Sequence, residues 1–308
     1  MKGRVELVEF NLRDESPLTG LSLAEVYQKF QIKILVCAVK RGGQVYIPDG
    51  DFVLQKGDKM HIAAAAHQDL ETFFRSLGRK NARVKKVLIC GGGHVCFYLA
   101  AQLLQAGMQV KIIESRQERC EQLCEVLPKA TIIHGDAADH DLLMEEGIGE
   151  ADAVIALTGM DEENIIMSLF AKTQGVNKIV AKVNEDSRAQ MVEGLGIDSI
   201  VSAKSATADA IMSYVRARNN SYSSANVETM YRLLGGKVEA VEFIIKKECK
   251  FTNVPLKDLP TKANYLIACI GRKRKVIIPN GEDHLEVGDS VIVITKDHII
   301  NEFSDILA

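Results

Sequence analysis

A run of three glycines, Gly91-Gly92-Gly93, carries the clearest chemical signal in the chain. It follows a short apolar strand expected over residues 86–91 and precedes an amphipathic helix expected over 94–106. Glycine lets the backbone pass close to a diphosphate, and free N–H groups at a helix start face an anion. We therefore expect Gly91 and Gly93 to form a turn under a diphosphate, with the N–H groups of His94 and Val95 donating to it.

Glu114 is the second chemical signal, since it ends the next expected strand 23 residues after Gly91. A carboxylate at this place accepts ribose hydroxyls in dinucleotide-binding folds. It would also repel a 2′-phosphate, so NAD(H) is favoured over NADP(H), and ATP or ADP stays open. Cys96 stands where the fingerprint has its third glycine, a position that serves helix packing rather than phosphate contact.

Charged and polar side chains near the other strand ends add candidates. Arg116 could reach a phosphate, cover the adenine, or lie on the surface. Thr158 and Gly159 follow the fourth expected strand, at the point where ligands of such sheets bind. Lys182 on the fifth strand could contact a terminal phosphate or pair with a surface carboxylate. The His94 ring is a further possible phosphate partner.

The central part of the chain alternates between apolar runs and amphipathic segments. Strands are expected over 86–91, 109–114, 130–134, 153–158, 178–183 and 199–202, and helices over 94–106, 116–127, 138–146, 161–174, 186–195 and 205–218. This alternation predicts an α/β fold with a doubly wound, parallel, Rossmann-like sheet in the order 3-2-1-4-5-6. The polar stretch 218–224 resembles an exit linker.

The two ends of the chain repeat each other. Residues 5–10 resemble 238–243, residues 45–50 resemble 276–281, and residues 54–58 resemble 285–289. Each copy predicts a small α+β module with mostly antiparallel strands. The expected domains are therefore a first module over 1–78, a nucleotide-binding domain over 84–222, and a second module over 229–308.

Composition narrows the class of protein. Residues 83–228 hold 14 lysines and arginines against 20 acidic residues, which argues against nucleic acid as a partner. The seven cysteines form no CxxC pair, no apolar run approaches a membrane span, and no metal-binding motif is present. We expect a cytoplasmic protein without a resident metal.

This layout resembles the RCK or KTN domains that regulate potassium conductance, in particular TrkA-type regulatory subunits of Trk potassium-uptake systems. The resemblance rests on Gly91–Val95, Glu114, Gly135-Asp136-Ala137, and Ala153–Thr158 with Asp161 and Asn164. It implies that Asp136 and Ala137 line the adenine, although Asp136 could instead cap the helix that follows. It implies that Asp161 and Asn164 serve capping and subunit contact.

The resemblance also implies a function and partners. A TrkA-type subunit senses a nucleotide and gates a membrane potassium transporter, which it reaches as a homodimer or larger ring. Such subunits usually carry the pair of domains twice, so we expect the first nucleotide-binding domain to be missing from this chain.

Other functions stay open at this point. An NAD-dependent oxidoreductase would need an acid–base group, for which His134 and His140 are the one candidate pair, and we expect no enzymatic activity. The chain could also be an assembly module with an empty crevice. Arg41 and Arg272 occupy matching places in the two modules, where they could bind an anionic ligand or be exposed turn charges.

Overall fold

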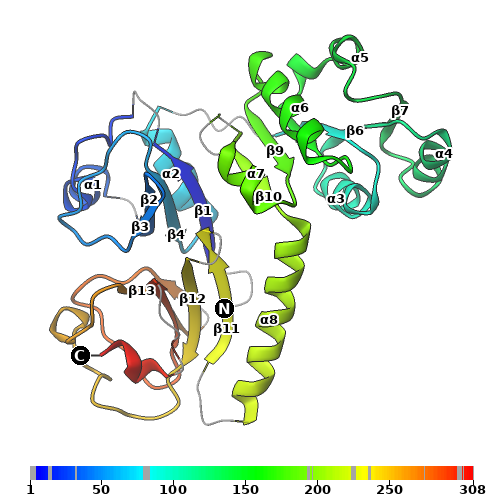
Figure 1. Cartoon of the computed structure of the whole chain (residues 1–308). Coiled ribbons are helices and arrows are strands. Elements are labelled where there is room, and N and C mark those ends of the chain that lie inside the picture. The colour runs from blue at the N-terminus through cyan, green and yellow to red at the C-terminus, as the bar shows by residue number, and fades with distance from the viewer. Residues whose placement is uncertain are drawn as a thin grey trace. The chain divides into compact units, whose positions relative to one another are not determined.

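The computed structural model describes residues 5–12, 16–31, 33–78, 84–192, 195, 197–222, 227–234, 237–273, 275–296, 300 and 302–307 (Figure 1). The chain divides into two compact units. One comprises residues 82–208, and the other comprises residues 1–81 together with 209–308. We describe each unit by itself. The division of the sequence into three domains stays a prediction.

A parallel sheet of six strands forms the first of these units, residues 82–208, with the order β10-β9-β8-β5-β6-β7. The strands are β5 Lys86–Cys90, β6 Gln109–Glu114, β7 Thr131–His134, β8 Ala153–Ala156, β9 Lys178–Lys182 and β10 Ser199–Val201. This is the expected order 3-2-1-4-5-6, so the prediction of a doubly wound, Rossmann-like sheet is confirmed.

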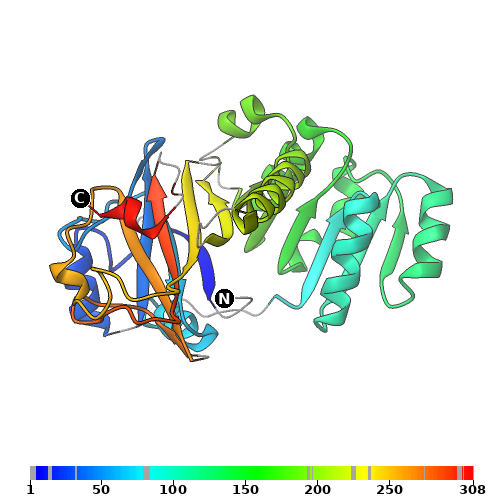
Figure 2. The same ribbon diagram turned by 90° about the horizontal axis from the view of Figure 1, so that it is seen from below.

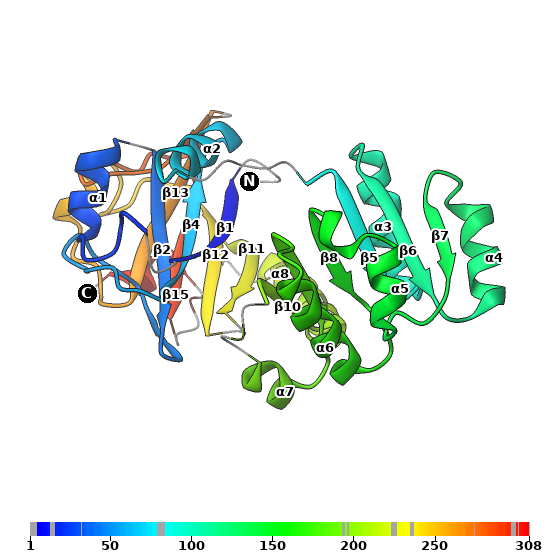
Figure 3. The ribbon, with the colours of Figure 1, turned by 90° about the horizontal axis from the view of Figure 1, so that it is seen from above.

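Helices cover both faces of this sheet (Figure 3). They are α3 His94–Gln105, α4 Gln117–Val126, α5 His140–Glu145, α6 Asp161–Thr173, α7 Asp186–Met191 and the start of α8 Ala203–Tyr222. Side chains of α3 and α4 pack on Ile89 and Ile112, whereas those of α5 and α6 pack on Cys90 and Ile113. Burial on both faces explains why the strands are continuous apolar runs.

Helix α8 is longer than the sequence indicated. The polar residues 218–222 belong to the helix, so their interpretation as part of a linker is wrong, and residues 223–224 lie outside the described ranges. Asparagine and serine are weak helix formers, and each costs only a fraction of a kcal/mol per position. Within the described ranges, no helix has the length and apolar character needed to cross a bilayer.

The two repeated segments form sheets of matching topology. The first copy has the antiparallel order β1-β4-β2-β3, and the second has β12-β15-β13-β14 with the additional strand β11 beside β12. The strands are β1 Glu6–Asn11, β2 Ile34–Arg41, β3 Gln44–Tyr46, β4 Lys59–Ala64, β11 Val227–Leu233, β12 Val238–Ile244, β13 Tyr265–Arg272, β14 Lys275–Ile277 and β15 Ser290–Lys296. The first copy also has helices α1 Leu23–Phe30 and α2 His67–Ser76.

The two copies share an apolar seam between their sheets (Figure 2). Its buried side chains are Cys37, Ala38, Val45 and Ala63 from the first copy, and Val238, Ala240, Ala268, Cys269 and Ile294 from the second. A β-bulge lies at the same place in both copies, between Val36 and Ala38 in β2 and between Ile267 and Cys269 in β13. Small side chains at these positions let the two sheets approach closely.

A buried ion pair recurs in both copies. Arg41 Nε lies 2.7 Å from Asp58 Oδ1, and Arg272 Nε lies 2.9 Å from Asp289 Oδ1. Each aspartate is at most 1% exposed, and each arginine also donates to a backbone carbonyl. The pKa of both arginines is raised, chiefly by these hydrogen bonds. The two arginines therefore stabilise the turns of their own modules. This role explains their matching positions without an anionic ligand, and their buried partners show that they are not merely exposed turn charges.

The buried pair in the second copy predicts a large effect on stability. Asp289→Ala leaves the Arg272 guanidinium without its buried carboxylate, so we expect the free energy of unfolding to fall by about 3 kcal/mol. Chemical denaturation followed by circular dichroism measures this change.

A matched control lies in the same module. Lys257 and Glu282 form an ion pair of 2.7 Å, but their side chains are 51% and 75% exposed. Glu282→Ala should therefore cost less than about 1 kcal/mol. Equal losses for Asp289→Ala and Glu282→Ala would contradict the structural role of the buried pair.

The seam predicts the reactivity of its thiols. Burial raises the pKa of Cys37, with a smaller contribution from the neighbouring Cys269, and burial raises the pKa of Cys269 to about 12. A thiol that is buried and protonated reacts slowly. We expect an aromatic disulfide reagent to modify the exposed Cys124 in the native protein, and Cys37 and Cys269 only after denaturant is added. Mass spectrometry of peptides locates the label, and rapid native labelling of Cys37 would contradict the packing of the seam.

Candidate functional site

Two of the three glycines are required by close packing at the end of β5. Gly91 has φ +100°, and a Cβ there would lie 2.9 Å from the backbone of Leu157 and Thr158. A Cβ on Gly92 would lie 2.7 Å from Leu123 Cδ1 and 3.0 Å from Glu114 Oε2. A side chain at Gly91 would displace the residues that follow β8, and one at Gly92 would displace Leu123 of α4 or Glu114 at the end of β6. These two glycines are therefore explained by the fold alone.

Gly93 differs from its neighbours because open space surrounds it. It precedes α3 with φ −66°, and a Cβ there would meet no atom within 4 Å. The first hydrogen bond of the helix runs from the N–H of Phe97 to Gly93, so the N–H groups of His94 and Val95 come before it. Both residues are exposed. Within the described ranges no partner is found for these two N–H groups, so the helix start presents donors and a positive dipole end to an open surface.

Glu114 lies behind this loop as a buried carboxylate, 6% exposed. Its Oε2 accepts the Gly92 N–H at 2.8 Å, and its Oε1 accepts the Arg116 N–H at 2.9 Å and Nε at 3.2 Å. Burial alone would raise the pKa of Glu114, but these hydrogen bonds and the guanidinium together hold it below the ordinary value. Glu114 is therefore ionised, and three of its roughly four acceptor positions are already used.

Two arginines of the β6–α4 segment complete the loop. Arg116 contacts Glu114 but its side chain is 71% exposed, so it can move to a ligand at little cost. Arg119 donates from Nε to the Gly92 carbonyl at 2.8 Å. Sequence reasoning missed Arg119, which lies in the first turn of α4, three residues after the N-cap residue Arg116.

The residues after β7 divide into an exposed and a buried member. Asp136 is exposed and accepts the N–H of Ala138 at 2.9 Å, whereas Ala137 is 6% exposed and belongs to the core. Asp139 caps α5 with its own carboxylate. The alternative in which Asp136 caps this helix is therefore wrong, because Asp139 is adjacent to the first turn.

The two histidines of the candidate acid–base pair make different contacts. His134 Nε2 lies 3.0 Å from the carbonyl oxygen of Ser115, and the His140 ring stacks on Phe170 with centroids 4.1 Å apart. Each ring thus has a separate protein contact. Among the described residues, no group of three or more histidine, cysteine or acidic side chains is arranged to hold a metal ion.

Lys182 reaches from β9 toward the glycine turn. Its Nζ lies 3.4 Å from the carbonyl oxygen of Leu157, a carbonyl that also lies close to Gly91. Lys182 is half-buried, and the hydrogen bond found for its ammonium group among the described residues goes to a carbonyl and not to a surface carboxylate. This long hydrogen bond leaves donors of Lys182 available beside the turn.

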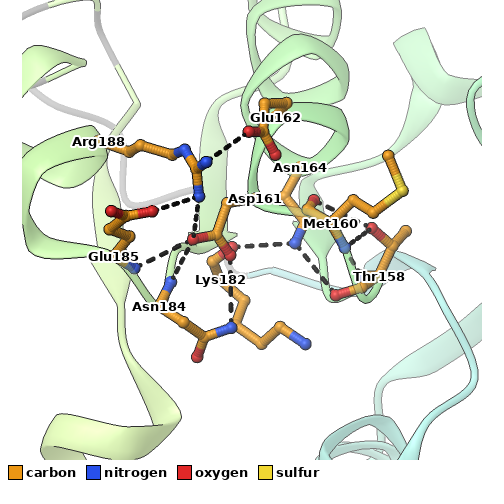
Figure 4. Close-up of polar contacts among 9 residues, drawn as sticks. All are labelled: Thr158, Met160, Asp161, Glu162, Asn164, Lys182, Asn184, Glu185 and Arg188. Carbon is orange, nitrogen blue, oxygen red and sulfur yellow. Dashed lines mark hydrogen bonds and ion pairs between the residues drawn. The ribbon is translucent and has the colours of Figure 1, made fainter.

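Thr158 and Gly159 form the loop between β8 and α6. The Thr158 N–H is bonded to the Asn164 side chain at 2.8 Å, and Gly159 is exposed with no atom near a Cβ position. Asp161 and Asn164 are buried on the first turn of α6, where they bond to backbone groups (Figure 4). The prediction that they cap α6 is wrong, because its N-cap residue is Met160 and no side-chain hydrogen bond caps the helix within the described residues. Their expected role in subunit contact stays a prediction.

The geometry offers groups that can bind a ligand at one end of the sheet. Free amides at the start of α3, the half-buried Lys182 and the ionised Glu114 lie around one end of the sheet, at the carboxyl ends of β5, β6, β8 and β9. This is the edge where α/β sheets of this topology bind ligands. Amides and an ammonium suit phosphate oxygens, and a carboxylate suits sugar hydroxyls.

Comparison with known proteins gives matches over both units. Residues 87–203 match the TrkA-N domain, and residues 7–78 and 240–308 match the TrkA-C domain. The chain is 31% identical over 304 residues to the Trk system potassium uptake protein TrkA homolog of Archaeoglobus fulgidus, covering 99% of this chain and 66% of that protein. It is 30% identical over 299 residues to TrkA of Halomonas elongata, covering 96% and 64%.

Solved structures support the fold. The RCK domain of GsuK is similar with a TM-score of 0.54 at 18% identity, covering 96% of this chain and 61% of that one. The GsuK channel bound to NAD is similar with a TM-score of 0.53 at 18% identity, covering 96% and 51%.

These matches account for nearly the whole of the sequence and for its repeat. The chain spans somewhat less than two thirds of the length of the two relatives named above. One TrkA-N domain lies between two TrkA-C domains. The chain therefore belongs to the family of proteins built from TrkA-N and TrkA-C domains.

Proposed function

We propose that this chain is a nucleotide-sensing regulatory component of a Trk-type potassium-uptake system. Its parallel sheet would bind NAD(H), or alternatively ATP or ADP, at the glycine turn. The nucleotide would act as a signal and would not be consumed. The regulatory activity is proposed and not inferred directly from the relatives, because the chain covers only 66% and 64% of their lengths.

The observation that carries the proposal is the contrast between Gly93 and Glu114. An open, amide-lined helix start lies next to a buried carboxylate, Glu114, whose pKa burial alone would raise and whose pKa the hydrogen bonds of the loop instead hold below the ordinary value. In the proposed complex, the diphosphate lies over Gly93, His94 and Val95, and the ribose lies at Glu114. Gly91 shapes the turn beneath them.

The remaining candidates take places around the same ligand. Arg116 would leave Glu114 to cover the adenine or reach a phosphate, and Asp136 and Ala137 would lie at the adenine edge. Thr158, Gly159 and Lys182 would contact the far phosphate, since Lys182 and Gly91 both lie close to the Leu157 carbonyl. NAD is favoured among the candidate nucleotides because the GsuK channel, which has a similar fold, binds it.

The partner in this proposal is the membrane subunit of a Trk-type transporter, on the cytoplasmic side. The names of the relatives support that partner. Homodimer or ring formation is supported by exposed apolar side chains on α6 and α7, namely Ile166 at 57% and Met191 at 79%. A ligand can shift such an assembly only if it binds one of its shapes more tightly than the other.

The glycines provide a first test that separates packing from ligand contact. Gly93→Ala meets no protein atom, so it should change the free energy of unfolding by no more than about 1 kcal/mol. The added methyl would hinder the diphosphate, so we expect affinity for NADH to fall at least about tenfold. Calorimetric titration measures the affinity, and chemical denaturation measures the stability.

Gly91→Ala is the matched comparison for this test. Its methyl would meet the backbone of Leu157 and Thr158, so this variant should be strongly destabilised. If Gly93→Ala binds NADH as well as the unaltered chain, the proposed position of the diphosphate is wrong.

Glu114 provides a second test, on the choice of dinucleotide. The unaltered chain should bind NADH at least about tenfold more tightly than NADPH, because the carboxylate repels the 2′-phosphate. Glu114→Gln removes the charge and should reduce this ratio toward unity. The measured quantity is the ratio of the NADH affinity to the NADPH affinity, since a general disturbance of the loop would weaken the binding of both ligands alike.

Glu118→Gln is the control, because it removes one negative charge from an exposed position of the first turn of α4. It should leave the ratio unchanged. A ratio near unity in the unaltered chain would mean that Glu114 does not lie at the ribose.

A further inference from the structure

We propose that Asn164, together with Asp161, is a positioning residue of the nucleotide site. The two side chains form a clasp that joins the carboxyl ends of β8 and β9, and so fixes the two loops that present Thr158 and Lys182. This inference rests on the proposed function and names a further element of that site. It assigns these residues a role other than capping or subunit contact.

Asn164 forms the inner part of the clasp. It is 0% exposed, and its Oδ1 accepts the Thr158 N–H at 2.8 Å. Its Nδ2 donates to the Lys182 carbonyl at 2.9 Å and to the Thr158 carbonyl at 3.3 Å (Figure 4). One buried amide thus satisfies both backbone groups of Thr158 and one of Lys182. No shorter or purely apolar side chain could make these three contacts.

Asp161 forms the outer part of the clasp, one helical turn away. Its carboxylate is 6% exposed and accepts the N–H groups of Asn184 and Glu185 at 2.9 and 3.0 Å. Arg188 lies 3.8 Å from the same carboxylate and also pairs with Glu162 and Glu185. The turn that follows β9 is therefore held to the start of α6 from both sides.

The clasp borders an open groove of about 380 Å³, which is lined by Asp161, Asn184, Glu185 and Arg188 and also by Gly159, one of the proposed ligand contacts. Lys182 Nζ approaches the Leu157 carbonyl beside the glycine turn. A ligand that pulls on Thr158 or Lys182 must therefore move the β9–α7 turn as well, because the same buried side chains hold both.

A double-mutant cycle tests whether Asn164 acts through Lys182. The variants are Asn164→Ala, Lys182→Ala and the pair, in the full chain, with NADH and ADP as titrants. We expect each single change to weaken NADH binding about tenfold, and the pair to bind within about threefold of Lys182→Ala alone. A merely structural loss would instead multiply the two effects.

Ser168→Ala is the matched control. Ser168 is also 0% exposed, and its hydroxyl donates to the Asn164 carbonyl at 2.6 Å, whereas no hydrogen bond from its side chain to either loop is found among the described residues. This variant loses a buried hydrogen bond of α6 and should keep its NADH affinity. Asn164→Asp serves if Asn164→Ala does not fold, since aspartate keeps the acceptor for Thr158 and cannot donate to the Lys182 carbonyl.

A second measurement follows the outer part of the clasp. Hydrogen exchange at Asn184 and Glu185 should slow when NADH binds to the unaltered chain, and should be unaffected by NADH in the Asn164 variant. Neither amide is proposed to contact the ligand, so this protection reports the connection itself.

The outcomes separate the two proposals. If the unaltered chain binds NADH, the inference is overturned when the Asn164 variant binds normally, when Lys182→Ala has no effect, or when the two effects multiply independently. If the unaltered chain binds neither NADH nor ADP, the proposed function fails first, and the inference fails with it.

Discussion

The buried carboxylate of Glu114 is the contact on which the proposed nucleotide-binding edge of the sheet depends. It accepts the Gly92 N–H at 2.8 Å and the Arg116 N–H at 2.9 Å, and so ties the turn after β5 to the turn after β6. Leaving such a charge buried without donors would cost several kcal/mol. Because the loop supplies these donors, the charge persists and the glycine turn keeps one shape.

The three glycines have different roles around this contact. A side chain at Gly91 or Gly92 would collide with Leu157, Leu123 or Glu114, whereas Gly93 lies in open space. A site built in this way is formed before any ligand arrives, which lowers the cost of ordering it on binding. The clasp of Asp161 and Asn164 extends the same principle to the other side of the crevice, where β8 and β9 end.

The two repeated modules show how a repeat in sequence becomes one packed structure. Each copy holds its own turn with a bidentate arginine–aspartate pair, and each has a bulge at the same point of its central strand. The bulges and the small side chains around Cys37 and Cys269 lie at the seam, where the sheets bury each other. Arg41 and Arg272 therefore stabilise the turns of their own modules. Their matching places in the sequence were also compatible with an anion-binding site.

The order of the parallel strands, the repeat, and the glycine turn followed by an acid were all determined by the sequence itself. Alternation of apolar runs with amphipathic helices leaves few topologies, and a glycine turn with a distant acid has few other uses. Only the tertiary structure decided which groups already have partners. Long-range contacts gave Glu114 a donor at Gly92, gave Arg272 a buried aspartate, and placed Lys182 beside Leu157. The reason is that hydrogen bonds join residues 17 to 27 positions apart, and local pattern carries no information about such pairings.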